Sequence, residues 1–159
     1  MSERLIRLAE RIRSGLVDLN RLVERAREGL RRARLEDDDL YLDSVALNLH
    51  GFYAGLERLF ELTAANVDGA IPQGANWHQI LLQQMAAEIP GVRPAMISER
   101  LRDSLDEYRG FCHVYTFSFD PLKMRKLVEQ APAVVAQLRR ELLAFAEFLE
   151  DRAQTDTKS

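Results

Sequence analysis

Residues 40–67 read LYLDSVALNLHGFYAGLERLFELTAANV, and this stretch is the strongest indication of the fold class. Apolar side chains recur in it at helical spacing, and further apolar residues flank them on both sides of the helical wheel. The main stripe comprises Leu42, Val45, Leu49, Phe52, Leu56, Leu59, Phe60 and Thr63. So broad an apolar surface predicts a central, largely buried helix. Its polar interruptions are His50, Tyr53, Glu57 and Arg58.

A long amphipathic helix is predicted upstream of this stretch. Its apolar residues alternate spacings of four and three, which makes a heptad seam, and its arginines lie outside that seam. The seam residues are Leu5, Ala9, Ile12, Leu16, Leu19, Val23, Ala26, Leu30 and Ala33. Gly15 and Gly29 are expected outside it. Such a seam can pack against another helix of the same bundle or against a second copy of the chain.

Three more helices are expected downstream. A short one covers NWHQILLQQMAAEI, and Ser98 is a suitable N-cap for ERLRDSLDEYRGFCHVY. Asp120 and Pro121 suit the start of a last helix, which should reach about Arg152 and be kinked or divided at Pro132. We therefore predict an all-α antiparallel bundle of about five helices over residues 1–153, with long first and last helices. Residues 154–159 are expected to be a disordered tail.

Composition limits the class of protein further. The chain has 159 residues, of which 47% are apolar and 30% charged, and its one cysteine cannot form an internal disulfide. No stretch approaches the roughly 20 apolar residues of a membrane span, and the N-terminus lacks the apolar core of a signal peptide. These features predict a cytoplasmic protein without membrane contact. Residues 1–34 hold ten Arg against five acidic residues, whereas the whole chain carries a net charge of −3.

The segment YRGFCHVYTF, residues 108–117, carries the candidate chemistry. Arg109 and His113 stand four residues apart, so on a helix they share one face, and Tyr115 follows near the helix end. A guanidinium can hold a phosphate while an imidazole moves a proton, which is a minimal set of groups for cleaving RNA without a metal. The alternative is structural: Arg109 pairs with a nearby carboxylate (Asp103, Asp106 or Glu107), and His113 is an interior histidine. No metal site and no cofactor are expected, because no Cys or His pair has ligand spacing.

Four blocks of the chain resemble the HepT-like ribonucleases of the HEPN superfamily. These blocks are DDDLYLDSVALNLHGFYAGLERLFEL, NWHQILLQQMA, GVRPAMIS and LDEYRGFCHVYTFSFDPLKM. The resemblance covers roughly residues 36–150 and implies a helical toxin of a bacterial toxin–antitoxin pair. It implies a homodimer that cuts RNA, either tRNA or mRNA, with an arginine and His113 as catalytic residues, and Arg109 is our candidate for that arginine. It also implies a nucleotidyltransferase antitoxin that adds AMP to the tyrosine matching Tyr115.

The catalytic motif of that family matches only in part. His113-Val114-Tyr115 fits its His-spacer-Tyr ending, but five residues before His113, where an arginine belongs, stands Tyr108. The family also carries a longer stretch between the residues matching Phe111 and Tyr115. Losing close to one turn of about 3.6 residues rotates later side chains by only about 40 degrees, so the helix still packs.

Three functions therefore stay open at this point. The first is an active ribonuclease toxin, and the second is an inactive HEPN bundle that binds the nucleotidyltransferase or RNA. The third is a helical scaffold that joins partners through the heptad seam. Tyr53 and Glu57, one turn apart on the central helix, are expected to support the catalytic residues. Tyr115 is either the AMP acceptor or a half-buried aromatic with its hydroxyl at the surface.

Overall fold

The computed structural model describes residues 2–114 and 120–159, and 83% of the chain is helical. Its elements are α1 (Ser2–Glu36), α2 (Leu40–Thr63), the π-helical turn η1 (Ala64–Asp68), α3 (Trp77–Met85), α4 (Glu99–Val114) and α5 (Pro121–Lys158). Within the described ranges there is no strand, only an isolated bridge between Ile89 and Arg93. The prediction of an all-α bundle of five helices, long at both ends of the chain, is confirmed.

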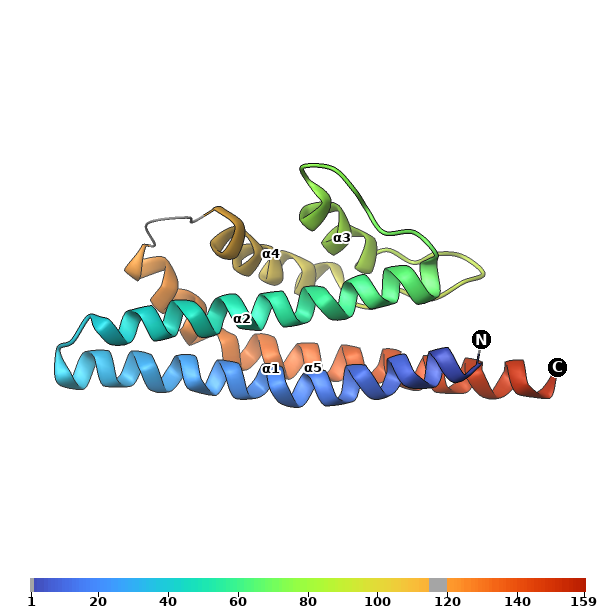
Figure 1. The fold of residues 1–159 in the computed structure, drawn as a ribbon, viewed down its shortest axis with the longest axis horizontal. Coiled ribbons are helices and arrows are strands. Elements are labelled where there is room, and N and C mark those ends of the chain that lie inside the picture. The colour runs from blue at the N-terminus through green and yellow to red at the C-terminus, as the bar shows by residue number, and fades with distance from the viewer. Residues whose placement is uncertain (1, 115–119) are drawn as a thin grey trace.

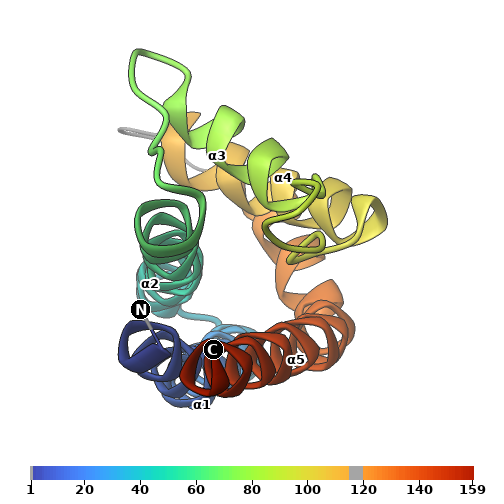
Figure 2. The ribbon, with the colours of Figure 1, turned by 90° about the vertical axis from the view of Figure 1, so that its right-hand side faces the viewer.

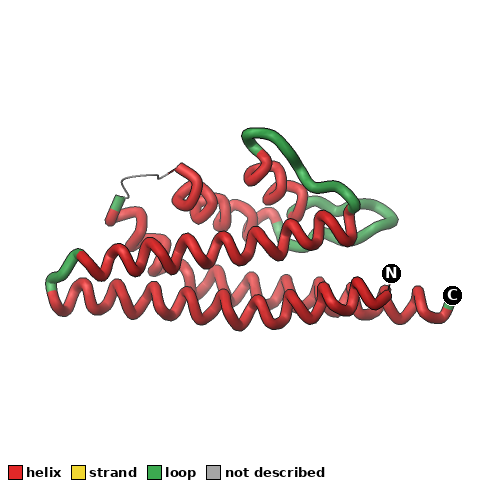
Figure 3. The backbone as a smooth tube through the Cα atoms, viewed as in Figure 1, coloured by secondary structure: helices red, strands yellow, loops and turns green. Residues whose placement is uncertain are grey.

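The three long helices form the body of the molecule. α1 runs beside both α2 and α5, and α1 begins at the same end of the bundle at which α5 ends (Figure 1). The end-on view places α3 and α4 across the bundle from α1, where α3 covers part of α2 and α4 contacts both α2 and α5 (Figure 2). Helices account for almost all of this arrangement, and the two longer described connections, residues 69–76 and 86–98, are loops (Figure 3).

The heptad seam of α1 lies inside this bundle. Every predicted seam residue from Leu5 to Leu30 is buried, and Ala33 is half-buried. Because α1 packs against α2 and α5, these side chains contribute to the core of one chain. The seam therefore cannot join the chain to partners, which removes the scaffold hypothesis in its stated form.

The central helix is buried as its pattern predicts. All residues of the α2 stripe are buried except Leu42, which is half-buried, and the polar residues Asn48, Tyr53 and Glu57 are buried with them. α2 ends at Thr63 rather than near Val67, because the backbone continues into η1. Two capping predictions hold: the Leu101 amide donates to Ser98 Oγ at 3.2 Å, and the Leu122 amide donates to Asp120 Oδ1 at 2.9 Å.

The last helix fits one of its two predicted alternatives at Pro132 and differs from its prediction at the C-terminal end. Pro132 lies within α5 without dividing it, and the N-terminal part of α5 is inclined to the rest in Figure 1. α5 also continues past Arg152 to Lys158, so residues 154–158 are helical and not a disordered tail. Ala153 is buried, and Thr157 Oγ1 donates to the Ala153 carbonyl at 2.9 Å. These contacts extend the helix beyond the point where its apolar pattern weakens.

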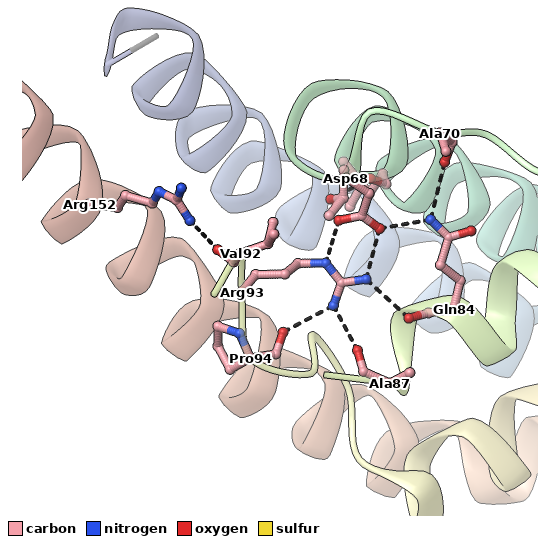
Figure 4. A network of polar contacts seen from close by, with 10 residues as sticks. Asp68, Ala70, Gln84, Ala87, Val92, Arg93, Pro94 and Arg152 are labelled. Carbon is pink, nitrogen blue, oxygen red and sulfur yellow. Dashed lines mark hydrogen bonds and ion pairs between the residues drawn. The ribbon is translucent and has the colours of Figure 1, made fainter. Parts of the chain in front are cut away.

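A buried arginine holds the two longer connections together (Figure 4). Arg93 donates from Nε and Nη2 to the carboxylate of Asp68 at 2.5 and 2.8 Å. Its remaining hydrogen bonds go to the carbonyls of Gln84, Ala87 and Pro94, so the guanidinium is fully satisfied. Gln84 completes the network by donating from Nε2 to Asp68 at 2.7 Å. Asp68 closes η1, so this network ties the end of α2 to the segment before α4.

Replacing either of two helical glycines by alanine should change the stability of the protein, in opposite directions. A Cβ at Gly110 in α4 would meet no described atom within 4 Å, so we expect Gly110→Ala to raise the free energy of unfolding by about 1 kcal/mol through helix propensity. Gly29, expected outside the seam, is instead buried where α1 meets α2. A Cβ there would lie 3.0 Å from Val45 Cγ2, so Gly29→Ala should be less stable than the wild type. Urea unfolding measures the free energy of unfolding of both variants. A Gly110→Ala protein no more stable than the wild type would contradict this account.

Candidate functional site

Five polar or ionisable side chains gather where α2, α3 and α4 meet. Tyr53 and Glu57 come from α2, His78 from the first turn of α3, and Arg109 and Cys112 from α4. Tyr53 and Glu57 are one helical turn apart, and the broad buried face of α2 turns them away from solvent. Charge interactions connect Glu57 with His78, Arg109 and Cys112, and Tyr53 with Arg109. We call this group the α2–α4 cluster.

The centre of the α2–α4 cluster is a hydrogen bond between the carboxyl group of Glu57 and the imidazole of His78. Glu57 Oε2 lies 2.8 Å from His78 Nδ1; 8% of the Glu57 side chain is exposed, against 26% of His78. Burial raises the pKa of Glu57, while its hydrogen bond to His78 and the charge of Arg109 act in the opposite direction. The imidazole also stacks on its neighbour Trp77, with ring centroids 3.7 Å apart. Glu57 and Trp77 thereby fix the orientation of the His78 imidazole.

Sequence reasoning included Glu57 among the candidate residues but missed His78. No local pattern in the sequence assigns a role to His78, which lies 21 residues from Glu57. The signal that could have revealed it is Glu57 itself, since a carboxylate within a buried stripe needs a nearby proton donor. A histidine beside Trp77 at the start of a short helix satisfies that need.

Arg109 is half-buried and held by its own helix. Its Nε donates to Asp106 Oδ1 at 2.7 Å, and 19% of the Arg109 side chain is exposed, compared with 48% of Asp106. One of the three carboxylates considered from the sequence is therefore the actual partner. A guanidinium has five N–H donors, and among the described residues only Nε has a hydrogen bond. Arg109 can thus keep its ion pair to Asp106 and present its Nη groups to an anion.

The neighbours of Arg109 on α4 have structural roles. Burial raises the pKa of the Cys112 thiol to about 12, and its Sγ contacts the Leu49 carbonyl at 3.8 Å, so it is not a thiolate near neutral pH. Tyr108 is buried, its hydroxyl donates to the Leu127 carbonyl at 2.6 Å, and its ring meets Phe52 edge-on at 5.5 Å. Burial raises the pKa of both Tyr53 and Tyr108. Tyr108 is therefore a packing residue.

A comparison with known protein families identifies the family of this chain. The profile of the family described as HepT-like protein matches residues 44–149, which is more than half of the chain. The chain belongs to the HepT-like protein family. No curated protein and no solved structure matches it significantly. The HepT-like region begins in the first turns of α2 and ends within α5, so it includes every member of the α2–α4 cluster.

Two of the predicted site residues of this HepT-like chain, His113 and Tyr115, lie at the limit of the described residues. The backbone of His113 continues α4, one turn beyond Arg109. The side chain of His113 and the whole of Tyr115 lie outside the described residues. The structure therefore brings together Tyr53, Glu57 and Arg109, and their relation to His113 and Tyr115 stays a prediction.

Two other properties of the HepT-like chain concern metals and membranes. In residues 2–114 and 120–159, no three His, Cys, Asp or Glu side chains gather in a way that could hold a metal ion. None of the helices in that part of the chain combines the length and apolarity that crossing a bilayer requires.

Proposed function

We propose that this HepT-like chain is the toxin of a bacterial type VII-like toxin–antitoxin pair and a metal-independent endoribonuclease. It acts as a homodimer in the cytoplasm, and a nucleotidyltransferase antitoxin neutralises it. The observation that carries the ribonuclease proposal is the position of Arg109: half-buried, anchored by Asp106 and adjacent to the buried Glu57 in a HepT-like chain. A cation anchored in this way is suited to a phosphate that gains charge during reaction.

The proposed reaction is an internal transfer at phosphorus. The ribose 2′-oxygen forms a bond to phosphorus, the bond from phosphorus to the 5′-oxygen breaks, and the products are a 2′,3′-cyclic phosphate and a 5′-hydroxyl. His113 takes the proton from the 2′-hydroxyl or delivers one to the leaving 5′-oxygen. Arg109 stabilises the charge that grows on the phosphoryl oxygens. Tyr53 and Glu57 keep Arg109 and its surroundings in position.

Regulation is proposed to act through Tyr115. The antitoxin would transfer AMP from a nucleoside triphosphate to the tyrosine hydroxyl, with release of pyrophosphate. The added phosphodiester places a negative charge two residues from His113, where it would compete with RNA for Arg109. Family membership supports this step, and Tyr115→Phe should prevent it.

Replacing His113 tests the ribonuclease assignment. We expect His113→Ala to abolish RNA cleavage in the presence of a chelator and to abolish toxicity in cells. The circular dichroism spectrum should stay unchanged, because His113 lies in the last turn of α4. His113→Gln provides a control that keeps a polar side chain without proton transfer near neutral pH. Full cleavage by either variant would contradict the role given to His113.

A second function is favoured by one specific observation. Tyr108, which stands where the family's motif arginine belongs, is buried and bonded to Leu127, so it cannot take over the role of that arginine. If Arg109 does not replace the missing motif arginine, the chain is a catalytically inactive HEPN bundle that binds the nucleotidyltransferase or RNA. This alternative predicts binding of RNA or of the partner without any cleavage.

A further inference from the structure

A basic groove runs between the N-terminal half of α1 and the C-terminal half of α2. Its volume is about 670 Å³, and its cationic lining consists of Arg4, Arg7 and Arg11 from α1 and Arg58 from α2. The single carboxylate in the lining is Glu3. Figure 1 shows why the two helices contribute together, since α1 begins beside the end of α2. Four guanidinium groups from two helices therefore converge on one depression.

The positive charge of the basic groove is only partly neutralised. Arg7 pairs with Glu3 on α1, and Arg58 Nη1 lies 3.1 Å from Glu61 Oε2. Both arginines are solvent-exposed, so they exchange these carboxylates readily for other anions. The guanidinium groups of Arg4 and Arg11 have no ion pair or hydrogen bond within the described residues. Seven residues of helix separate them, which is about 10 Å along the axis.

Two other grooves show that this charge excess is local. One lies between α1 and α5, and each of its arginines, Arg27, Arg31 and Arg34, has a carboxylate partner: Glu24, Glu28 and Glu129 respectively. We call it the balanced groove.

The other groove lies between α3 and α4, beside the α2–α4 cluster. It is lined by the three carboxylates of Asp103, Asp106 and Glu107 against the single cation Arg102. This acidic groove would repel a polyanion. A nucleic acid that reaches the α2–α4 cluster is therefore attracted from the α1–α2 side and not along the α3–α4 groove.

We infer that the basic groove binds the ribose-phosphate backbone of RNA and holds the substrate beside the α2–α4 cluster. The planar fork of arginine matches a phosphodiester, and the leucines Leu8 and Leu62 in the lining give sugar and base an apolar surface. Arg58 directly follows Glu57 on α2, and successive residues of a helix point about 100 degrees apart. The groove and the cluster thus occupy neighbouring sides of one helix, about 10 Å across.

This inference rests on the proposed function, because it gives the same ribonuclease its substrate-holding surface. Binding is measured by fluorescence anisotropy with a single-stranded, 2′-O-methylated RNA, which lacks the attacking hydroxyl and cannot be cut. We expect Arg4→Gln/Arg11→Gln to bind about tenfold more weakly than the wild type at about 50 mM salt. The slope of log K against log salt should fall by about 1.4, which corresponds to two lost phosphate contacts.

Arg27→Gln/Arg31→Gln is the matched control. It removes the same charge from the same helix, but from the balanced groove, and should bind the RNA as the wild type does. Equal weakening in both variants would mean that only net charge matters and would overturn the inference. Tighter binding of polyglutamate than of RNA would also overturn it, because the groove would then fit an acidic protein.

Cleavage of unmodified RNA separates this inference from the proposed function. If the Arg4→Gln/Arg11→Gln variant cleaves with an unchanged kcat/KM, the groove has no part in substrate binding and the inference fails, while the ribonuclease stands. If the wild type binds RNA through the groove but cleaves nothing, the inference stands and the ribonuclease fails.

Discussion

Arg109→Ala is expected to slow RNA cleavage by about a hundred- to a thousandfold, the cost of removing one preorganised group that stabilises transition-state charge. Arg109 is held by Asp106 at 2.7 Å and is four-fifths buried, so its position requires little reorganisation when RNA binds. Arg109→Lys should recover only part of the loss, because an ammonium keeps the charge without the planar fork. The measurement is single-turnover cleavage with a chelator present.

Arg102 offers a matched control on the same helix. It also pairs with a neighbouring carboxylate, Asp103, at 3.0 Å, but it lines the acidic groove and does not belong to the α2–α4 cluster. Arg102→Ala should cleave RNA at nearly the wild-type rate. A comparable loss in both variants, or none in Arg109→Ala, would show that Arg109 has no special role.

Arg93→Met should lower the free energy of unfolding by about 3–5 kcal/mol, the cost of leaving one partner of a buried ion pair uncompensated. The Arg93 and Asp68 side chains are 0% and 2% exposed, and methionine would leave the Asp68 carboxylate with Gln84 as its remaining side-chain donor. For a chain of this size the melting temperature should fall by about 10 °C. Urea unfolding followed by circular dichroism measures the loss.

The surface pair of Arg13 and Glu150 provides the comparison. It also joins distant helices, α1 and α5, but about two-fifths of each side chain is exposed to solvent. Arg13→Met should leave the urea midpoint unchanged, because exposed pairs add little stability. A loss in Arg93→Met no larger than that in Arg13→Met would show that the network of Figure 4 is not what ties the two connections together.

Helix positions could be predicted because they depend on local pattern. The α2 stripe, the α1 seam, and the caps at Ser98 and Asp120 each depend on residues within a few positions of one another, and the structure confirms them. Pro132 shows the limit of local rules, because they predict either a kink or a division there and cannot decide that α5 stays one continuous helix.

Contacts between distant segments could not be predicted in the same way. His78 reaches Glu57 across 21 residues, and Arg93 reaches Asp68 across 25, in each case through the path of a loop. No periodicity describes such a path, so local pattern identifies neither pair. The burial of Gly29 likewise depends on how closely α1 and α2 approach, which the pattern of α1 alone does not show.

The most direct test of this account is RNA cleavage by the unaltered chain with all metal chelated, followed by mass spectrometry of the product ends. We expect fragments that end in a 2′,3′-cyclic phosphate and begin with a 5′-hydroxyl, the products of the transfer proposed for Arg109 and His113. The same assay on a variant with one helical turn inserted between Phe111 and Tyr115 gives the reference. Cleavage by that variant alone, with RNA left intact by the unaltered chain, would contradict the account and identify the chain as a binding module.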